Sequence, residues 1–134
     1  MGINDLAPLY DNSKTIEEIL ANFETYIGYI ITALKTANSG IKIFLATIVP
    51  SYASSTNQAY QQLNEKIKNI ANANDNTYLM DLTTYSALAS KPEYNVTHPT
   101  ALGYHKLANE IKAYISYLIS KNLSDFTNVQ FINL

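Results

Sequence analysis

The sequence predicts an α/β domain with parallel strands. Three amphipathic segments alternate with two short apolar segments in the order helix–strand–helix–strand–helix, the order produced by right-handed crossover connections. The chain has 134 residues, 47% of them hydrophobic, which suffices for one domain with one core. Two strands are few for a parallel sheet, because both of its edges need partners. We therefore expect a further strand beside residues 41–49, either from residues 1–4 or from a larger unit that includes the chain.

The first helix is predicted between residues 16 and 34, where apolar residues recur at the three- and four-residue spacing of one helical face. Thr15 and Glu18 have the spacing of a capping box. Asn38-Ser39-Gly40 is typical of a helix end. The predicted buried face consists of Ile16, Ile19, Leu20, Phe23, Ile27, Ile30, Ile31 and Leu34.

Two segments are predicted as strands. Residues 41–49 are almost continuously apolar and are closed by Pro50, a pattern typical of a strand buried on both faces. Residues 77–82 form the second predicted strand. Residues 83–98 are predicted to be mostly loop with one helical turn.

Two more helices are predicted from apolar periodicity. With the elements before them they form one predicted domain, residues 1–122. The second helix covers residues 57–73, with Tyr60, Leu63, Ile67 and Ile70 on one face. Residues 123–134 are expected to be a tail that forms a short strand or a linker. The last helix runs from about Thr100 to Lys121, and its predicted inner face consists of Leu107, Ala108, Ile111, Ile115 and Leu118.

Composition excludes several classes of function. All nine basic residues are lysines and the net charge is −2, whereas a protein that grips nucleic-acid phosphates normally presents a basic face with arginine. The absence of cysteine excludes a disulfide framework, a thiolate zinc site and a cysteine nucleophile. The sequence shows neither a run long enough to span a bilayer nor a signal-peptide pattern. We expect no cofactor, no metal and no nucleic-acid partner.

Two stretches carry residue types suited to catalysis. One is Gly2-Ile3-Asn4-Asp5, and the other runs from Asn95 through His98-Pro99 to Gly103-Tyr104 at the start of the last helix. A histidine between a strand and a helix lies at the carboxyl edge of the sheet, where open α/β folds bind their ligands. Its ordinary pKa of about 6.5 suits a general base. Plain structural interpretations also exist, since Asn-Asp favours turns and His-Pro can simply begin a helix.

At this distance and in this order, the two stretches resemble the SGNH (GDSL) hydrolase family of esterases and lipases. The third block of that family is Gly-x-Asn-Asp, and its fifth is Asp-x-x-His-Pro followed by Gly-Tyr and a helix. The resemblance covers residues 2–120. It implies a flavodoxin-like three-layer α/β/α sandwich with a parallel sheet, whose amino-terminal strands are expected to be missing from this chain.

The resemblance also implies roles for individual residues. Asn4 would donate its side-chain amide to the oxyanion of an acyl-transfer intermediate, an interaction worth roughly 10²–10³ in rate. His98 would be the general base that activates a serine and then protonates the leaving alcohol. Gly2 would permit a tight turn at the end of a strand, and Asp5 would support the site structurally.

The chain departs from the family pattern in two ways. The Gly-Asp-Ser-x-Ser block with the nucleophile and the block with the oxyanion glycine are absent, so the nucleophile is expected on a segment upstream. Asn95 stands where the family has its triad aspartate, and an equivalent change in a serine protease lowers kcat about 10⁴-fold. Asp81 or Glu93 is an alternative source of the carboxylate. Ser51, Ser54 and Ser55 follow a predicted strand but lack a nucleophile-elbow motif, and we interpret them as loop residues.

Three hypotheses for function follow from the sequence. In the first, the chain is the carboxyl-terminal part of an SGNH-type serine hydrolase of acyl or acetyl esters of a carbohydrate or lipid, inactive alone. In the second, it is a non-catalytic binding or assembly module that pairs with itself or with a missing amino-terminal segment, because an exposed strand edge favours association. In the third, it is an unrelated small α/β protein.

Overall fold

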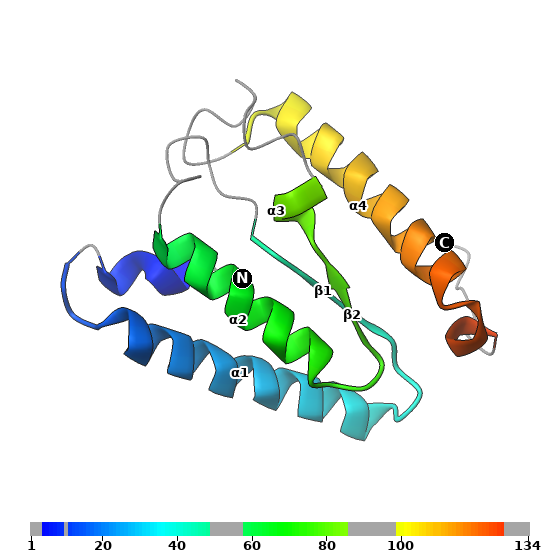
Figure 1. Ribbon diagram of the computed structural model, residues 1–134, viewed down its shortest axis with the longest axis horizontal. Coiled ribbons are helices and arrows are strands. Elements are labelled where there is room, and N and C mark those ends of the chain that lie inside the picture. Colours follow the sequence, from blue (N-terminus) through cyan, green and yellow to red (C-terminus); the bar gives the residue numbers. More distant parts are fainter. Residues whose placement is uncertain (1–3, 10, 49–57, 86–98, 128–134) are drawn as a thin grey trace.

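The computed structural model describes residues 4–9, 11–48, 58–85 and 99–127 (Figure 1). This part of the chain is mostly helical with a small parallel sheet, which agrees with the predicted α/β class. None of its helices is both long and apolar enough to cross a membrane. In chain order the elements are η1 (Asn4–Leu9), α1 (Ile16–Ala37), β1 (Ile43–Ala46), α2 (Gln58–Asn72), β2 (Thr77–Met80), α3 (Leu82–Tyr85), α4 (Ala101–Lys121) and η5 (Leu123–Phe126).

The sheet consists of β1 and β2, which pair in parallel from Ile43 opposite Thr77 to Ala46 opposite Met80. Helices α1 and α2 cover one face and α4 covers the other (Figure 1). Side chains alternate between the two faces with the period of two that a strand imposes. Ile43, Leu45 and Leu79 pack against the buried side chains of α1 and α2. Phe44, Ala46, Tyr78 and Met80 pack on the opposite face, with side chains of α4.

The predicted capping box at the start of α1 is confirmed. The Thr15 hydroxyl accepts a hydrogen bond from the Glu18 N–H at 3.3 Å, and the Glu18 carboxylate accepts one from the Thr15 N–H at 2.8 Å. These bonds satisfy two backbone donors that the first helical turn leaves without partners. The predicted face is buried at Ile19, Phe23, Ile27 and Ile31, whereas Ile30 and Leu34 remain 39% and 37% exposed.

The largest buried cluster joins α1 and α2 to η1. Leu6 of η1 and Leu63 of α2 are almost completely buried, and both belong to this cluster. The helical turn η1 was not predicted from the sequence. The four predicted inner residues of α2 are confirmed as buried.

The strand at 41–49 differs from its prediction. Its regular part, β1, covers only four residues, and each of them is half-buried instead of buried on both faces. The reason is that β1 has a strand partner on one side only among the described residues. The second strand is also shorter than residues 77–82, because Leu82 begins α3.

The last helix begins as predicted, with the Thr100 hydroxyl accepting a hydrogen bond from the Gly103 N–H at 3.1 Å. The placement of Ala108 on its inner face is wrong, because Ala108 is exposed and Tyr114 packs inward. Residues 123–126, expected to begin a strand or linker, form η5, and Phe126 is buried beside the rings of Phe44 and Tyr78. The rest of the tail, 128–134, lies outside the described residues.

We predict that Thr15→Ala lowers the free energy of unfolding by about 1 kcal/mol, because it removes the acceptor for the Glu18 N–H. Thr25→Ala is the matched control: Thr25 is exposed in the middle of the same helix, where its hydroxyl bonds back to the Ala21 carbonyl. Its removal should change stability by less than about 0.5 kcal/mol. Urea unfolding measures both; equal losses in the two variants would contradict the capping role.

Candidate functional site

The carboxyl ends of β1 and β2 define one end of the molecule. Figure 1 shows η1 and the first turns of α1, α2 and α4 at this end. This arrangement follows from the topology, since each helix that leads into or out of a parallel strand runs antiparallel to it. The segments that carry Asn4 and the Thr100 cap therefore lie at the sheet edge where open α/β folds bind ligands.

The predicted site residues are described only in part. Asn4 is the first residue of η1 and its side chain is exposed, while Asp5 is half-buried. The convergence of Asn4 and His98 on one pocket stays a prediction. The other candidates lie outside the described residues: Gly2, Ser51, Ser54, Ser55, Glu93, Asn95 and His98.

A buried asparagine of α2 holds the carboxyl end of β1. The side chain of Asn64 is only 4% exposed. Its Oδ1 accepts a hydrogen bond from the Ile48 N–H at 2.8 Å, and its Nδ2 donates to the Ile48 carbonyl at 3.0 Å. The same Nδ2 donates to the Thr83 hydroxyl at 2.9 Å. One amide thus satisfies both backbone groups of Ile48 and links α2 to α3.

Two threonines extend this network across the sheet. The Thr83 N–H donates to the Thr47 Oγ1 at 3.0 Å, and the Thr83 hydroxyl donates to the Ile48 carbonyl at 2.9 Å. The Thr47 N–H donates to the Met80 carbonyl at 3.0 Å, which adds a ladder bond beyond the regular strand. We call Thr47, Ile48, Asn64 and Thr83 the carboxyl-edge network. It fixes the points at which the chain leaves β1 and enters α3.

Sequence reasoning assigned no role to Asn64 or Thr83. The available signal was the position of Asn64 within the inner stripe of its helix, directly after Leu63 and three residues before Ile67. A polar residue on an apolar helix face requires hydrogen-bond partners once it is buried. The identity of those partners depends on how α2 crosses the end of β1.

Asp81, one alternative carboxylate for the triad, follows β2 directly and is buried to 9% exposure. Its Oδ2 lies 3.4 Å from the Nζ of Lys68, which also contacts the Glu65 carboxylate at 3.0 Å. The hydrogen bond that Lys68 donates to Glu65, together with the negative charge of Asp81, raises the pKa of Lys68 against the opposing effect of desolvation. Asp81 is therefore already engaged by a cation of α2.

Glu110 is a carboxylate that sequence reasoning missed. It lies on α4 between Leu107 and Tyr114, which both pack inward. Its Oε2 is buried and has no hydrogen-bond partner among the described residues. A buried acceptor of this kind normally has a partner. No group of three or more histidine, cysteine or acidic side chains in the described ranges is arranged to hold a metal ion.

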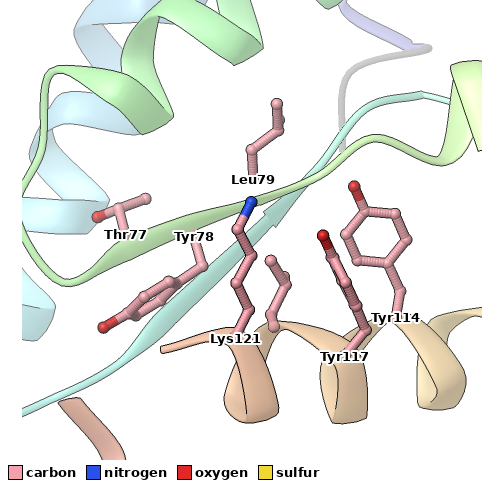
Figure 2. A pocket seen from close by; sticks show the side chains of 7 residues that line it. Thr77, Tyr78, Leu79, Tyr114, Tyr117 and Lys121 are labelled. Carbon is pink, nitrogen blue, oxygen red and sulfur yellow. The ribbon is translucent and has the colours of Figure 1, made fainter. Parts of the chain in front are cut away.

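A cavity lies away from this end, between β2 and the last turns of α4. Its volume is about 580 Å³. Figure 2 shows the Tyr78 side chain pointing from the strand towards the helix that carries Tyr114, Tyr117 and Lys121, whereas the side chains of Thr77 and Leu79 lie on the other side of the strand. The Tyr78 hydroxyl donates to the Asp125 carboxylate at 2.9 Å. Desolvation, together with this hydrogen bond and the negative charge of Asp125, raises the pKa of Tyr78 to about 12.

We predict that Asn64→Leu lowers the free energy of unfolding by about 3 kcal/mol, because it removes three hydrogen bonds and leaves the half-buried Ile48 N–H without its acceptor. Asn69→Leu is the control, since Asn69 is exposed on the same helix, and its effect should stay below about 0.5 kcal/mol. Denaturant unfolding gives both values. Hydrogen exchange should accelerate at the Ile48 amide in the first variant alone; unchanged exchange there would refute the role of the network.

We predict that Asp125→Asn lowers the pKa of Tyr78 while leaving it above the ordinary value of 10.0, because burial persists when the charge is removed. NMR titration of ¹³C-labelled tyrosine measures it, with Asp75→Asn as an exposed control. Folding raises the pKa of Tyr78, so the neutral phenol of Tyr78 stabilises the folded protein below pH 10. This contribution to the free energy of unfolding is lost as the pH rises towards 12. A Tyr78→Phe variant should not show that alkaline loss; an identical loss in both proteins would contradict the assignment.

Comparison with known proteins gives one finding at the level of families. Residues 1–111 match the family model of the GDSL-like lipases/acylhydrolases. No curated protein and no solved structure matches the chain. The matched range contains both stretches on which the resemblance was based, from Gly2-Ile3-Asn4-Asp5 to Gly103-Tyr104, and it spans most of the 134 residues. The chain therefore belongs to the GDSL-like lipase/acylhydrolase family.

Proposed function

We propose that the chain acts in serine-dependent ester hydrolysis, with an acyl or acetyl ester of a carbohydrate or lipid as the substrate. The observation that carries this proposal is the joint presence of Gly-x-Asn-Asp at residues 2–5 and His-Pro-x-x-x-Gly-Tyr at residues 98–104 within one family match. Each stretch alone suits a turn or a helix start, and their combination suits an acyl-transfer site.

The proposed chemistry divides between an imidazole and an amide. A serine hydroxyl attacks the ester carbonyl while His98 takes its proton, and the Asn4 amide stabilises the resulting oxyanion. The tetrahedral intermediate then expels the alcohol, which receives the proton from His98. Water attacks the acyl-enzyme in the same way and releases the acid. No metal or cofactor is required for these steps.

Local anchors support the positions of both segments. Leu6, two residues after Asn4, is buried to 1% exposure in the main core. Thr100, two residues after His98, caps α4 through the Gly103 N–H, and Gly103 is itself buried. Both anchored segments lie at the carboxyl end of the sheet (Figure 1). Preorganised donors at such an edge are effective because they need no rearrangement during the reaction.

We further propose that the complete fold is the flavodoxin-like three-layer α/β/α sandwich of SGNH hydrolases. The covering of the small sheet by α1 and α2 on one face and by α4 on the other supports this (Figure 1). A parallel sheet of this kind needs more strands than β1 and β2. The groove lined by apolar side chains of α1, α2 and β1 offers apolar surface for such a strand to cover.

The nucleophile is the part of the site that these residues lack. The 134 residues contain no Gly-Asp-Ser run, so we propose that the isolated chain is inactive and works with a serine from another segment. Asn95 favours the second candidate function, a non-catalytic binding or assembly module, because an amide cannot stabilise an imidazolium as a carboxylate does. In either case we propose a small-molecule ligand and no nucleic-acid partner, since the chain is acidic and has no arginine.

We predict that the isolated chain neither reacts with a fluorophosphonate probe nor hydrolyses p-nitrophenyl acetate above the buffer rate. The native polypeptide that contains these residues, expressed with all of its flanking sequence, should do both. In that protein Asn4→Ala should lower kcat about 10²–10³-fold with little change in KM, because the amide acts in the transition state. In the same protein, His98→Ala alone should abolish most of the hydrolytic activity.

His105→Ala is the matched control, since His105 is exposed on α4 and its Nε2 lies 3.3 Å from the Nδ2 of Asn109. Its activity should equal that of the unmodified protein. An inactive native polypeptide would favour the binding module over the hydrolase. Activity that survives His98→Ala unchanged would refute the assigned base.

A further inference from the structure

The cavity between β2 and the last turns of α4, which we call the β2–α4 cavity, has the size and the lining of a ligand site. Its volume is about 580 Å³, and small-molecule pockets span roughly 300–1,000 Å³. Its lining consists of three tyrosines, two leucines, one threonine and one lysine. Pockets for small molecules are typically lined in this way, by apolar and aromatic side chains with a few polar groups that orient the ligand. The proposed ester hydrolysis leaves this cavity without a role.

Aromatic side chains of α4 form one wall of the β2–α4 cavity. The rings of Tyr114 and Tyr117 meet edge to face, with centroids 6.0 Å apart and planes at 86°. Tyr117 keeps 55% of its surface exposed, whereas Leu118 beside it is buried. The exposed ring can pack against a second flat apolar group at the centroid distance that aromatic pairs prefer, about 4.5–7 Å. This wall therefore favours a ligand with an aromatic body.

Lys121 is the charged residue of the cavity lining. Figure 2 shows its side chain extending from α4 towards β2, beside the side chains of Tyr114 and Tyr117. The Lys121 Nζ lies 5.8 Å from the centroid of the Tyr117 ring. No salt bridge joins Lys121 to an acidic residue in the part of the chain that the structure describes. An ammonium group at an apolar wall is matched best by an anion, because a charge is costly to desolvate without a partner.

The edge of β2 adds backbone hydrogen-bonding groups to the cavity. The carbonyls of Asn76 and Met80 accept hydrogen bonds from the β1 segment, at 2.8 and 3.0 Å. Alternate residues of a strand direct their backbone groups to opposite sides, so Thr77 and Leu79 direct theirs away from β1. The Leu79 side chain packs against α1 and α2 on the other face of the sheet. Leu79 therefore lines the cavity with its backbone, and its N–H is a second donor beside Lys121.

We propose that the β2–α4 cavity binds a small carboxylic acid with an aromatic body, of the class of the aryl-alkanoic acids. The carboxylate pairs with the Lys121 ammonium and accepts a hydrogen bond from the Leu79 N–H, and the aromatic body packs against Tyr114 and Tyr117. Hydrogen bonds to a charged group are about twice as strong as neutral ones. A carboxylate fits this site better than a phosphate, because one lysine supplies a single positive charge and the chain has no arginine to bind a phosphate through two donors.

Asp125 is an acidic residue close to the cavity, but it leaves Lys121 available. Its carboxylate accepts hydrogen bonds from the Tyr78 hydroxyl at 2.9 Å and from the Ser124 hydroxyl at 3.4 Å. It is not part of the cavity lining. Because the single phenolic proton of Tyr78 is donated to Asp125, Tyr78 offers the ligand its ring and no donor. The anion is therefore bound by Lys121 and Leu79.

An NMR titration of the intact 134-residue chain with 4-phenylbutanoate tests the proposal. The Leu79 amide should shift in a saturable way, with a Kd of about 1 mM or lower for a ligand of this size. The Ile43 amide, which donates to the Asn76 carbonyl, is the internal control and should keep its position. The neutral analogue 4-phenylbutanamide should bind about fivefold more weakly, because it lacks the charge that pairs with Lys121.

Two variants separate the contributions of charge and ring. Lys121→Met should weaken the binding of 4-phenylbutanoate about fivefold and leave that of 4-phenylbutanamide unchanged. Lys112→Met, at an exposed position of the same helix, is its control without effect. Tyr117→Ala should weaken the binding of both ligands about fivefold. Tyr104→Ala is the matched control, since Tyr104 is 54% exposed on α4 outside the cavity.

Several results would overturn the proposal. The absence of a saturable shift at Leu79 would do so, and so would equal affinities for 4-phenylbutanoate and 4-phenylbutanamide. Binding of 4-phenylbutanoate that Lys121→Met leaves unchanged would refute the assigned cation. A Leu79 shift that grows with protein concentration before any ligand is added would assign this edge to a second copy of the chain. None of these outcomes depends on ester hydrolysis, because the 134-residue chain contains every lining residue.

Discussion

The side-chain amide of Asn64 is the constraint on which the described arrangement depends. It makes three hydrogen bonds within the carboxyl-edge network and leaves no polar atom of its own side chain without a partner. A hydrogen bond adds only about 1 kcal/mol, but removing the amide leaves the Ile48 N–H desolvated and without an acceptor, which costs more. The direction of the chain at Ile48, just after the short strand β1, is therefore fixed by hydrogen bonds to α2 and not by a long series of hydrogen bonds between strands. Asn64 thus positions the end of β1, helix α2 and the start of α3 relative to one another.

Unequal covering of the sheet explains the surface features. The two faces are covered by helices, while the edges of a four-residue parallel pair have backbone groups to satisfy. The side chains that line the groove between α1, α2 and β1 are all apolar, whereas the cavity beside β2 is lined by tyrosines and a lysine. The first is the surface that the proposed further strand would cover. The second is a separate feature, because it lies at the opposite end from the segments that carry Asn4 and Thr100 (Figure 1).

Membership of the GDSL-like family and the geometry of the carboxyl edge bear on function in different ways. The family match concerns residue identity over 1–111, while the structure describes the supports on either side of the candidate site. Leu6 holds η1 in the core and Thr100 fixes the first turn of α4. A catalytic amide and a general base gain rate only when such supports hold them in place. The supports are consistent with the proposed roles of Asn4 and His98.

Local sequence determined the helices and their starts, because capping and apolar periodicity act within a few residues: Thr15, Glu18 and Thr100 act as predicted. The sequence also identified the family, because the motifs at residues 2–5 and 98–104 are recognised from residue types and spacing alone. Tertiary structure decided the length and half-burial of β1, the exposure of Ala108 and the partners of Asn64. These depend on which segments, distant in sequence, lie against each other. Periodicity shows that a face is apolar, but the crossing of the helices and the strand partners decide how much of that face is buried.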